Sequence, residues 1–184
     1  MKQRIDTKRL CSAALLLAAG ILLPQVFHSI GGPAAGGVFL PMHIPVLVAG
    51  LLLGPFYGAV IAVVTPVVSF LCMGMPPAAK LPFMVLELVG YGAVSGLLYS
   101  RKWNLYLSLV VAQMSGRAVY ALSLLMGAYI LRLPVPQVAV VGTAIVTGLP
   151  GIVIQLVFVP AVVILVRRVI RFDARDGIDK ADSV

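Results

Sequence analysis

The chain has 184 residues, of which 61% are hydrophobic and only 11% are charged, and its formal net charge is +8. Soluble globular chains carry about 45–50% apolar and about 25% charged residues, so this composition excludes an ordinary water-soluble domain and also a disordered chain. The hydrophobic runs are continuous and do not alternate with period two, which excludes an outer-membrane barrel. A membrane span takes about 20 apolar residues, so the chain has room for about six transmembrane helices.

Six apolar segments follow one another along the chain. We predict helices at about 10–28, 43–54, 56–73, 80–99, 104–131 and 137–168. The second is short, and we expect that it does not cross the bilayer at full depth alone. The basic N-terminus resembles a signal peptide, but further hydrophobic segments follow at once, so we expect an uncleaved first span. The predicted fold is an all-α integral membrane protein of one domain (1–184), with a bundle over about 10–170 and a polar cytoplasmic tail at 171–184.

Short stretches rich in Gly and Pro separate these segments, as expected for connections. They are GGPAAGG (31–37), GPFYG (54–58), GMPP (74–77), SRKWN (100–104) and LRLPVPQ (131–137). The first of them carries no charge, and we expect a flexible loop there.

Most basic residues precede the first segment, lie between the fourth and fifth, or follow the sixth. They are Lys2, Arg4, Lys8 and Arg9, then Arg101 and Lys102, then Arg167, Arg168, Arg171, Arg175 and Lys180. With six spans these three regions fall on one side, which the positive-inside rule makes the cytoplasm. We therefore expect both termini to be cytoplasmic. We attribute the excess of basic residues to membrane topology. We do not expect nucleic-acid binding, because the sequence offers no folded domain that would present a basic face.

Three polar residues lie at one depth inside the predicted bundle. The helical rise of about 1.5 Å per residue places Glu87, Arg117 and Gln155 about 18–20 Å from the cytoplasmic ends of their segments. Charges at membrane depth are costly and usually face the bundle interior or a cavity. We predict that these three side chains line one pocket that opens away from the cytoplasm and takes a small polar organic ligand. The alternative is an ion pair between Glu87 and Arg117 that only holds helices together. The two interpretations are compatible, because a binding site can use a paired charge.

Helical spacing adds further candidates to this pocket, because residues three, four or seven apart share a helix face. Lys80, Glu87 and Tyr91 share a face of the fourth segment, and Gln113, Arg117 and Tyr120 share a face of the fifth. The histidines, His28 and His43, lie near outer loops, where either can contact a ligand. Cys11 and Cys72 support neither a disulfide framework nor a metal site.

The first segment has a shallow face of small residues that includes Ala14 and Ala18, and small residues let helices approach closely in lipid. We expect a membrane protein partner to dock there. The sequence contains no G-x-x-x-x-G-K-[ST] loop and no H-E-x-x-H motif, so we expect neither ATPase activity nor a metal or other cofactor.

Several stretches resemble the substrate-binding S components of energy-coupling factor (ECF) vitamin transporters. They are FLPMHIPVLVAGLLLGPFYGAV (39–60), GMPP (74–77), ELVGYGAVSGLLY (87–99) and GLPGIVIQLVFVPAVV (148–163). The resemblance implies a six-helix membrane protein that docks on a transmembrane T protein with two ATPase subunits. In that family an A-x-x-x-A pattern on the first helix meets the T protein, and Ala14 and Ala18 match it. The family binds its vitamin on the outer half of the bundle.

We therefore expect a receptor for a vitamin or vitamin precursor in the plasma membrane of a prokaryote, driven by partner ATPases. A cationic arginine suits pantothenate, our preferred ligand, whereas a glutamate with tyrosines suits a hydroxymethylpyrimidine or pyridoxine type of ring. We expect 31–37 and the GMPP loop to close over the ligand. The alternatives are a self-sufficient secondary carrier and a non-transport membrane scaffold. A carrier typically shows repeated halves, and none is visible here.

Overall fold

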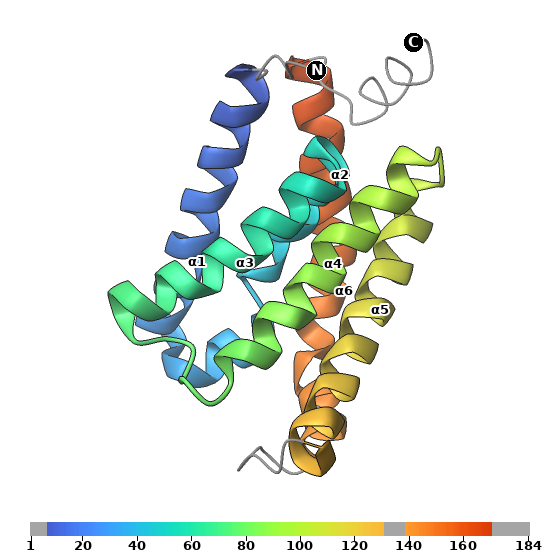
Figure 1. Cartoon of the computed structure of the whole chain (residues 1–184). Coiled ribbons are helices and arrows are strands. Elements are labelled where there is room, and N and C mark those ends of the chain that lie inside the picture. Colours follow the sequence, from blue (N-terminus) through green and yellow to red (C-terminus); the bar gives the residue numbers. More distant parts are fainter. Residues whose placement is uncertain (1–6, 131–138, 171–184) are drawn as a thin grey trace, which may run out of the picture.

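The computed structural model describes residues 7–130 and 139–170, and within these ranges it is helical without strands. The helices are α1 (Thr7–Phe39), α2 (His43–Leu53), α3 (Pro55–Met73), α4 (Leu81–Ser100), α5 (Leu105–Leu125), its π-helical extension η1 (Met126–Ile130), and α6 (Ala139–Ile170) (Figure 1). The predicted six-helix bundle is confirmed. The predicted connection at 131–137 and the polar tail at 171–184 lie outside the described residues.

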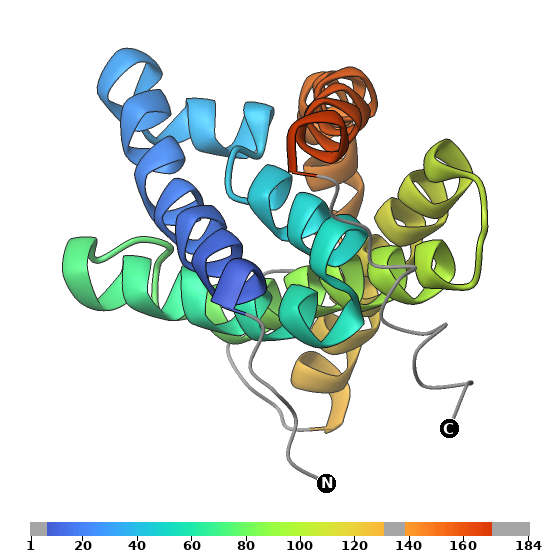
Figure 2. The ribbon, with the colours of Figure 1, turned by 90° about the horizontal axis from the view of Figure 1, so that it is seen from above.

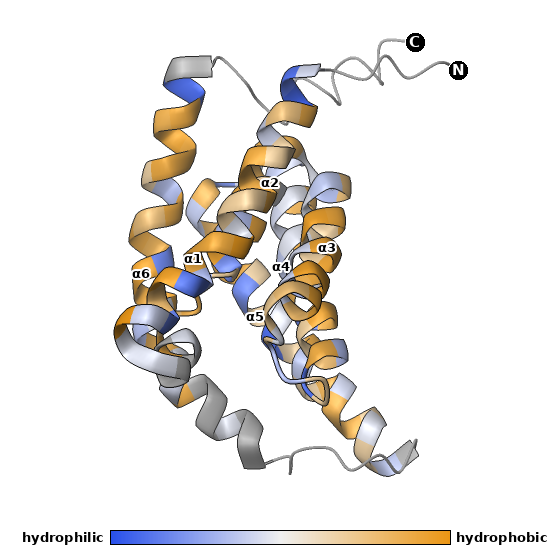
Figure 3. Cartoon of the chain, turned by 90° about the vertical axis from the view of Figure 1, so that its left-hand side faces the viewer, coloured by the Kyte–Doolittle hydropathy of each residue, from blue (hydrophilic) through white to orange (hydrophobic). Residues whose placement is uncertain are grey.

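Five helical stretches within the described ranges are long and apolar enough to cross a membrane: Thr7–Gly32, Pro55–Met73, Leu81–Ser100, Leu105–Tyr129 and Val146–Arg168. Hydrophobic residues make up much of the helices (Figure 3). Large apolar side chains such as Leu15, Leu71 and Met114 are about 70% exposed. An exposed apolar surface of this extent is expected for a protein whose solvent is lipid.

The short helix α2 is the centre of the bundle. Its 11 residues are too few to cross a bilayer, as predicted, and all of them except Ile44 are buried. A helix that is hydrophobic on all sides is either a core helix or a membrane span, and the burial of its residues makes α2 a core helix. Helices α1, α3, α4 and α6 all contact it, and the view along the bundle shows it among them (Figure 2).

Glycines bring α2, α3 and α4 into close contact. A methyl group added at Gly58 would collide with the carbonyl oxygen of Gly92, and one added at Gly50 would collide with the same oxygen. Without a hydrophobic driving force between helices in lipid, such close backbone packing is a principal source of association. These three helices therefore form a tightly packed wall. Helix α5 packs closely on α4, and α1 and α6 complete the bundle.

Local sequence sets the ends of α3 and the start of α5. Gly54, with φ 96°, precedes Pro55 at the first position of α3, where the fixed φ of proline suits a helix start. Gly74 ends α3 in the left-handed conformation (φ 69°), which glycine adopts without steric cost. The side chain of Asn104 accepts a hydrogen bond of 3.0 Å from the backbone N–H of Tyr106 and so caps α5.

The expectation of a flexible loop over 31–37 is wrong. The chain is helical on both sides of Gly32, which alone leaves helical geometry with φ 65° and ψ −170°. The helix that begins after Gly32 has proline at its first position, where the missing N–H costs no hydrogen bond. Composition alone misled here, because a single positive-φ glycine suffices to turn the chain between two helical pieces.

The start of α1, the α4–α5 connection and the end of α6 lie toward one end of the bundle, and the α3–α4 connection lies toward the other (Figure 1). The first end carries the described basic residues of the three predicted cytoplasmic regions: Lys8, Arg9, Arg101, Lys102, Arg167 and Arg168.

Candidate functional site

A cavity of about 450 Å³ lies in the half of the bundle away from that basic end, and every helix from α1 to α6 contributes to it. Its polar lining comprises His28, His43, Ser69, Lys80, Glu87, Arg117, Tyr120 and Thr147. Its apolar lining comprises Pro24, Gly36, Leu40, Pro41, Met42, Met75, Pro76, Pro77 and Met84. Pockets of about 300–1,000 Å³ with a few polar groups among apolar walls are typical of small-molecule sites.

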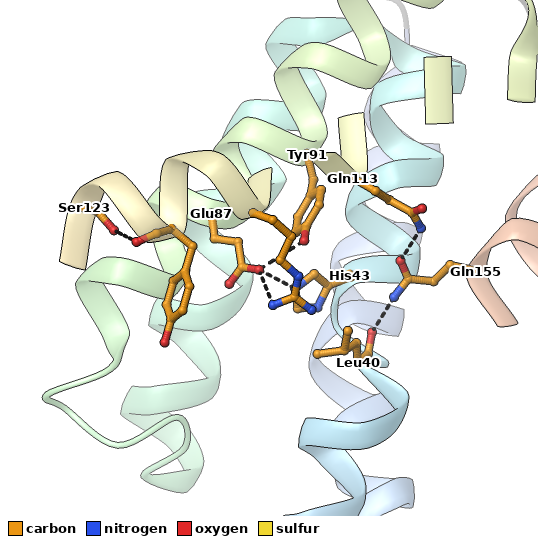
Figure 4. A network of polar contacts seen from close by, with 9 residues as sticks. Leu40, His43, Glu87, Tyr91, Gln113, Ser123 and Gln155 are labelled. Carbon is orange, nitrogen blue, oxygen red and sulfur yellow. Dashed lines mark hydrogen bonds and ion pairs between the residues drawn. The ribbon is translucent and has the colours of Figure 1, made fainter. Parts of the chain in front are cut away.

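The carboxylate of Glu87 is the hub of a buried polar network at this cavity (Figure 4). Its Oε1 lies 3.0 Å from Nη1 of Arg117 and accepts a hydrogen bond of 3.1 Å from the Tyr91 hydroxyl. The Nε2 of His43 is 3.9 Å from the same oxygen, which is too long for a hydrogen bond. The His43 ring instead meets Tyr91 edge-on, with 5.1 Å between ring centroids. Three helices thus converge on one carboxylate.

Two glycines make room for this network. The ring of Tyr91 packs against Gly116, where an added methyl group would lie 2.6 Å from the ring. The Nη2 atom of Arg117 packs against Gly148 of α6, where an added methyl group would lie 2.8 Å away. The positions of the ion pair on α4 and α5 therefore depend on missing side chains on the helices opposite.

A second polar pair lies behind the cavity wall. Gln113 donates a hydrogen bond of 3.0 Å from Nε2 to Oε1 of Gln155, which joins α5 to α6. Gln155 in turn donates from Nε2 to the backbone oxygen of Leu40 over 3.5 Å. Because Leu40 lines the cavity, this chain of contacts holds part of the cavity wall in place.

Several buried polar atoms at the cavity have no hydrogen-bond partner within the described chain. They are both ring nitrogens of His43, the hydroxyl of Ser69, and Nε and Nη2 of Arg117. Most buried polar groups in proteins are paired, so a cluster of unpaired ones needs an explanation. These atoms have almost no accessible surface, so a ligand in the cavity would pair with them only after the side chains reorient.

The structure brings five predicted site residues to the cavity and leaves three behind its wall. Glu87, Arg117, Tyr120, His43 and Lys80 line the cavity. Tyr91 supports Glu87 from behind, and Gln113 and Gln155 bond to each other. The predicted common depth of Glu87, Arg117 and Gln155 agrees with their contacts, but Gln155 reaches the cavity only through Leu40.

The lining also includes Ser69 and Thr147, which no sequence pattern singled out, and His28. His28 had a visible hint, since it lies near an outer loop. Ser69 is, with Thr65, one of two buried hydroxyl residues in the mostly apolar α3, which could have marked it. No group of three potential metal ligands (His, Cys, Asp or Glu) occurs among the residues that the structure places.

The predicted docking residues lie apart from the cavity, on the outer face of α1. Ala14 and Ala18 are both exposed, and Leu15 and Leu22 beside them are 73% and 59% exposed. This side of α1 is therefore uncovered in the isolated chain. Cys11 and Cys72 are also exposed, and neither forms a disulfide.

The fold and the cavity together define a helical membrane protein with an internal site of small-molecule size. A sequence profile of the family described as "ECF transporter, substrate-specific component" matches residues 8–163. The chain belongs to this family and is a multi-pass protein of the plasma membrane. Members of the family are substrate-binding subunits of transporters, not catalysts. A comparison with curated proteins and one with solved structures found no match.

Proposed function

We propose that this chain captures a vitamin or vitamin precursor in the cavity at Glu87 and Arg117. The observation that carries the proposal is the combination of an internal cavity of about 450 Å³ with a buried ion pair and unpaired polar atoms in its wall. A pair that served packing alone would need no cavity beside it. Tyr120, His43 and Lys80 would contribute ligand contacts, and Tyr91, Gln113 and Gln155 would hold the wall.

The proposed orientation places both termini in the cytoplasm and the cavity on the outer side. Basic residues gather at the start of α1, the α4–α5 connection and the end of α6, all at one end of the bundle. The positive-inside rule assigns that end to the cytoplasm. The helical piece after Gly32 and the loop at 74–77 border the cavity with Gly36, Met75, Pro76 and Pro77. They would close over the bound ligand.

The proposed partners are a transmembrane T protein and two ATPase subunits, in contact with membrane lipid. The sequence carries no Walker motif, so energy would come from the partner ATPases. The exposed small-residue face of α1 at Ala14 and Ala18 is the proposed contact with the T protein. Small residues at such a face permit close approach of another helix in lipid.

Among vitamins, pantothenate is our preferred ligand, with a hydroxymethylpyrimidine or pyridoxine type of compound as the alternative. Mass spectrometry of small molecules released from the purified, denatured protein tests this choice directly. Reconstitution with the T protein and ATPases in liposomes tests the function, and we expect ATP-dependent uptake of the released compound. Uptake by the chain alone would instead indicate a secondary carrier. Absence of any retained compound and of any uptake would favour a scaffold.

A further inference from the structure

The carboxylate of Glu87 has one oxygen engaged by the protein and one left for the cavity. All contacts of this carboxylate drawn in Figure 4 meet at Oε1. Arg117 Nη1 and the Tyr91 hydroxyl lie 3.0 and 3.1 Å from that atom. Oε2 has no hydrogen-bond or ionic partner within the described chain, and it is not one of the unpaired polar atoms there that are sealed from solvent. Because Glu87 lines the cavity, Oε2 is a carboxylate oxygen that a ligand can reach.

Arg117 holds this carboxylate but offers a ligand little itself. Its Nη1 is paired with Glu87, and its Nε and Nη2 have almost no accessible surface. Nη2 packs against Gly148 of α6, where an added methyl group would lie 2.8 Å away. The guanidinium therefore meets a ligand only if the side chain moves. By holding Oε1, it fixes the direction in which Oε2 points.

A second reachable polar group lies one turn further along α5. Tyr120 lines the cavity and is 2% exposed. Its hydroxyl has no hydrogen-bond partner among the residues that the structure describes and, like Oε2 of Glu87, is not one of the sealed atoms. Residues three apart share a helix face, so Tyr120 lies on the same face of α5 as Arg117. A phenolic hydroxyl both donates and accepts, whereas a carboxylate only accepts.

The charges of the wall decide what a ligand must present to Oε2. An ionised carboxylate has no proton to donate, so Oε2 takes only a hydrogen-bond donor. A ligand carboxylate at this point would bring two like charges together, which is unfavourable. A ligand ammonium would lie beside the guanidinium, in a lining where Lys80 and Arg117 already outnumber Glu87. An uncharged O–H or N–H group meets neither repulsion.

We infer, on the basis of the proposed function, that Glu87 selects the ligand by accepting a hydrogen bond at Oε2 from an uncharged hydroxyl or N–H group, with Arg117 as a positioning residue. A hydrogen bond to an ionised acceptor is stronger than one between neutral groups. Met84, one turn before Glu87, adds apolar surface to the same part of the lining, which suits a donor on an aliphatic or ring carbon. The hydroxyl end of pantothenate, and not its carboxylate, would then face Glu87.

The test measures binding to the purified full chain by calorimetry, with compounds that differ in one donor. The parents are pantothenate, pyridoxine and an aminohydroxymethylpyrimidine, each with counterparts in which one hydroxyl or amino group is replaced by hydrogen. Nicotinate and lipoate, whose ionised forms carry no O–H or N–H, are the donor-free controls. We expect the parent that binds most tightly to lose at least tenfold in affinity in one counterpart, and to bind at least tenfold more tightly than either control. This comparison needs no variant, so it stands even if a substitution prevents folding.

A second set of counterparts tests the charge of the donor. In these the same hydroxyl group is replaced by an ammonium group, as pyridoxamine does for pyridoxine. We expect the ammonium counterpart to bind at least tenfold more weakly than its parent, because it approaches the guanidinium of Arg117. Equal or tighter binding of the ammonium compound would overturn the inference of an uncharged donor.

Variants assign the contact to Glu87. In Glu87→Gln the loss on removing the donor should fall below threefold, because the charged acceptor is gone. In Arg117→Lys, which keeps a cation beside Oε1, the loss should stay at least tenfold. Met114→Ala, on the exposed side of α5, is the control and should leave all affinities unchanged. A merely structural Glu87 would weaken parent and counterpart alike, so a full tenfold loss in a folded Glu87→Gln protein would overturn the inference.

The inference and the proposed function fail in different ways. If the denatured protein releases a different compound, that compound replaces the parents, with its own one-donor counterparts. Release of a donor-free compound, or equal affinity of the parent and every counterpart, would overturn the inference. ATP-dependent uptake of that donor-free compound with the T protein and ATPases would leave the proposed function standing. Absence of uptake of any bound compound in the same assay would contradict the proposed function itself.

Discussion

Arg117 Nη1 lies 3.0 Å from Oε1 of Glu87 and so joins α5 to α4 at the cavity wall. The Tyr91 hydroxyl, one turn after Glu87, donates to the same oxygen and fixes the carboxylate. Isolated charges at this depth are costly, and pairing lowers that cost. The pair therefore has a structural role that does not depend on a ligand.

The ion pair predicts that variants lacking one partner are less stable than expected from the variant lacking both. Removing one partner leaves the other buried and unpaired, which costs about 3–5 kcal/mol. We expect Glu87→Gln and Arg117→Gln each to lower the apparent melting temperature of the ligand-free protein in detergent. The double variant should recover part of the loss, because it leaves no unpaired charge. A double variant as unstable as the sum of the single ones would contradict a direct pair.

Ligand affinity should depend on both members of the pair. We expect Arg117→Ala or Glu87→Ala to weaken binding at least tenfold, which corresponds to about 1.4 kcal/mol. The first removes the group that positions the carboxylate, and the second removes the proposed contact. Isothermal titration with the ligand identified by mass spectrometry measures both. Wild-type affinity in both purified variants would place the site elsewhere.

A matched pair of glycines on α6 tests the packing around Arg117. An added methyl group at Gly148 would lie 2.8 Å from Nη2 of Arg117, whereas at Gly142 it would meet nothing within 4 Å. We expect Gly148→Ala to weaken ligand binding several-fold because the guanidinium must shift. Gly142→Ala makes the same chemical change in the same helix and should bind normally. Equal affinities of the two variants would show that the position of Arg117 does not matter.

The outer face of α1 can be separated from the cavity by its own variants. We expect Ala14→Trp or Ala18→Trp to reduce ATP-dependent uptake with the T protein and ATPases, because a large side chain blocks close helix approach. Ligand binding by the isolated chain should survive. Leu71→Trp, on the exposed surface of α3, is the control for a bulky change facing lipid. Unchanged uptake in the alanine variants would rule out this docking face.

The two glutamines behind the wall should behave as a unit. Gln113→Leu leaves the buried Oε1 of Gln155 without its donor, which costs about 1–3 kcal/mol. We expect the double Gln113→Leu/Gln155→Leu variant to be more stable than the single one, since no polar atom is then left unpaired between α5 and α6. Thermal unfolding in detergent measures both. A double variant that is the less stable of the two would contradict this pairing.

Much of the fold could be predicted from the sequence because each helix carries its own hydrophobic run. The bilayer requires every backbone hydrogen bond to be made locally, so a run of about 20 apolar residues has essentially one solution. The prediction failed at 31–37, where glycine content indicated a loop but only Gly32 leaves helical geometry. Local composition cannot tell one turning residue from a whole flexible segment.

The candidate site was predicted in part. Glu87 and Arg117 stood out because charges within apolar helices are rare and functional. Helical spacing placed Tyr91 beside Glu87 correctly, but spacing does not tell which side of a polar cluster faces the cavity. Gln113 and Gln155 illustrate this limit, because each finds its partner on another helix. Ser69 comes to the cavity from α3, which sequence separation concealed.

The sequence by itself determined that this chain crosses a membrane, which segments form its helices, and which few charges had to be hidden within them, because hydropathy and helical rise act locally. Only the tertiary structure decided that α2 lies at the centre, that Gly116 and Gly148 make room for Tyr91 and Arg117, and that one edge of the guanidinium is left without a partner. These features depend on contacts between distant helices, and such contacts follow from how side-chain volumes fit together in three dimensions.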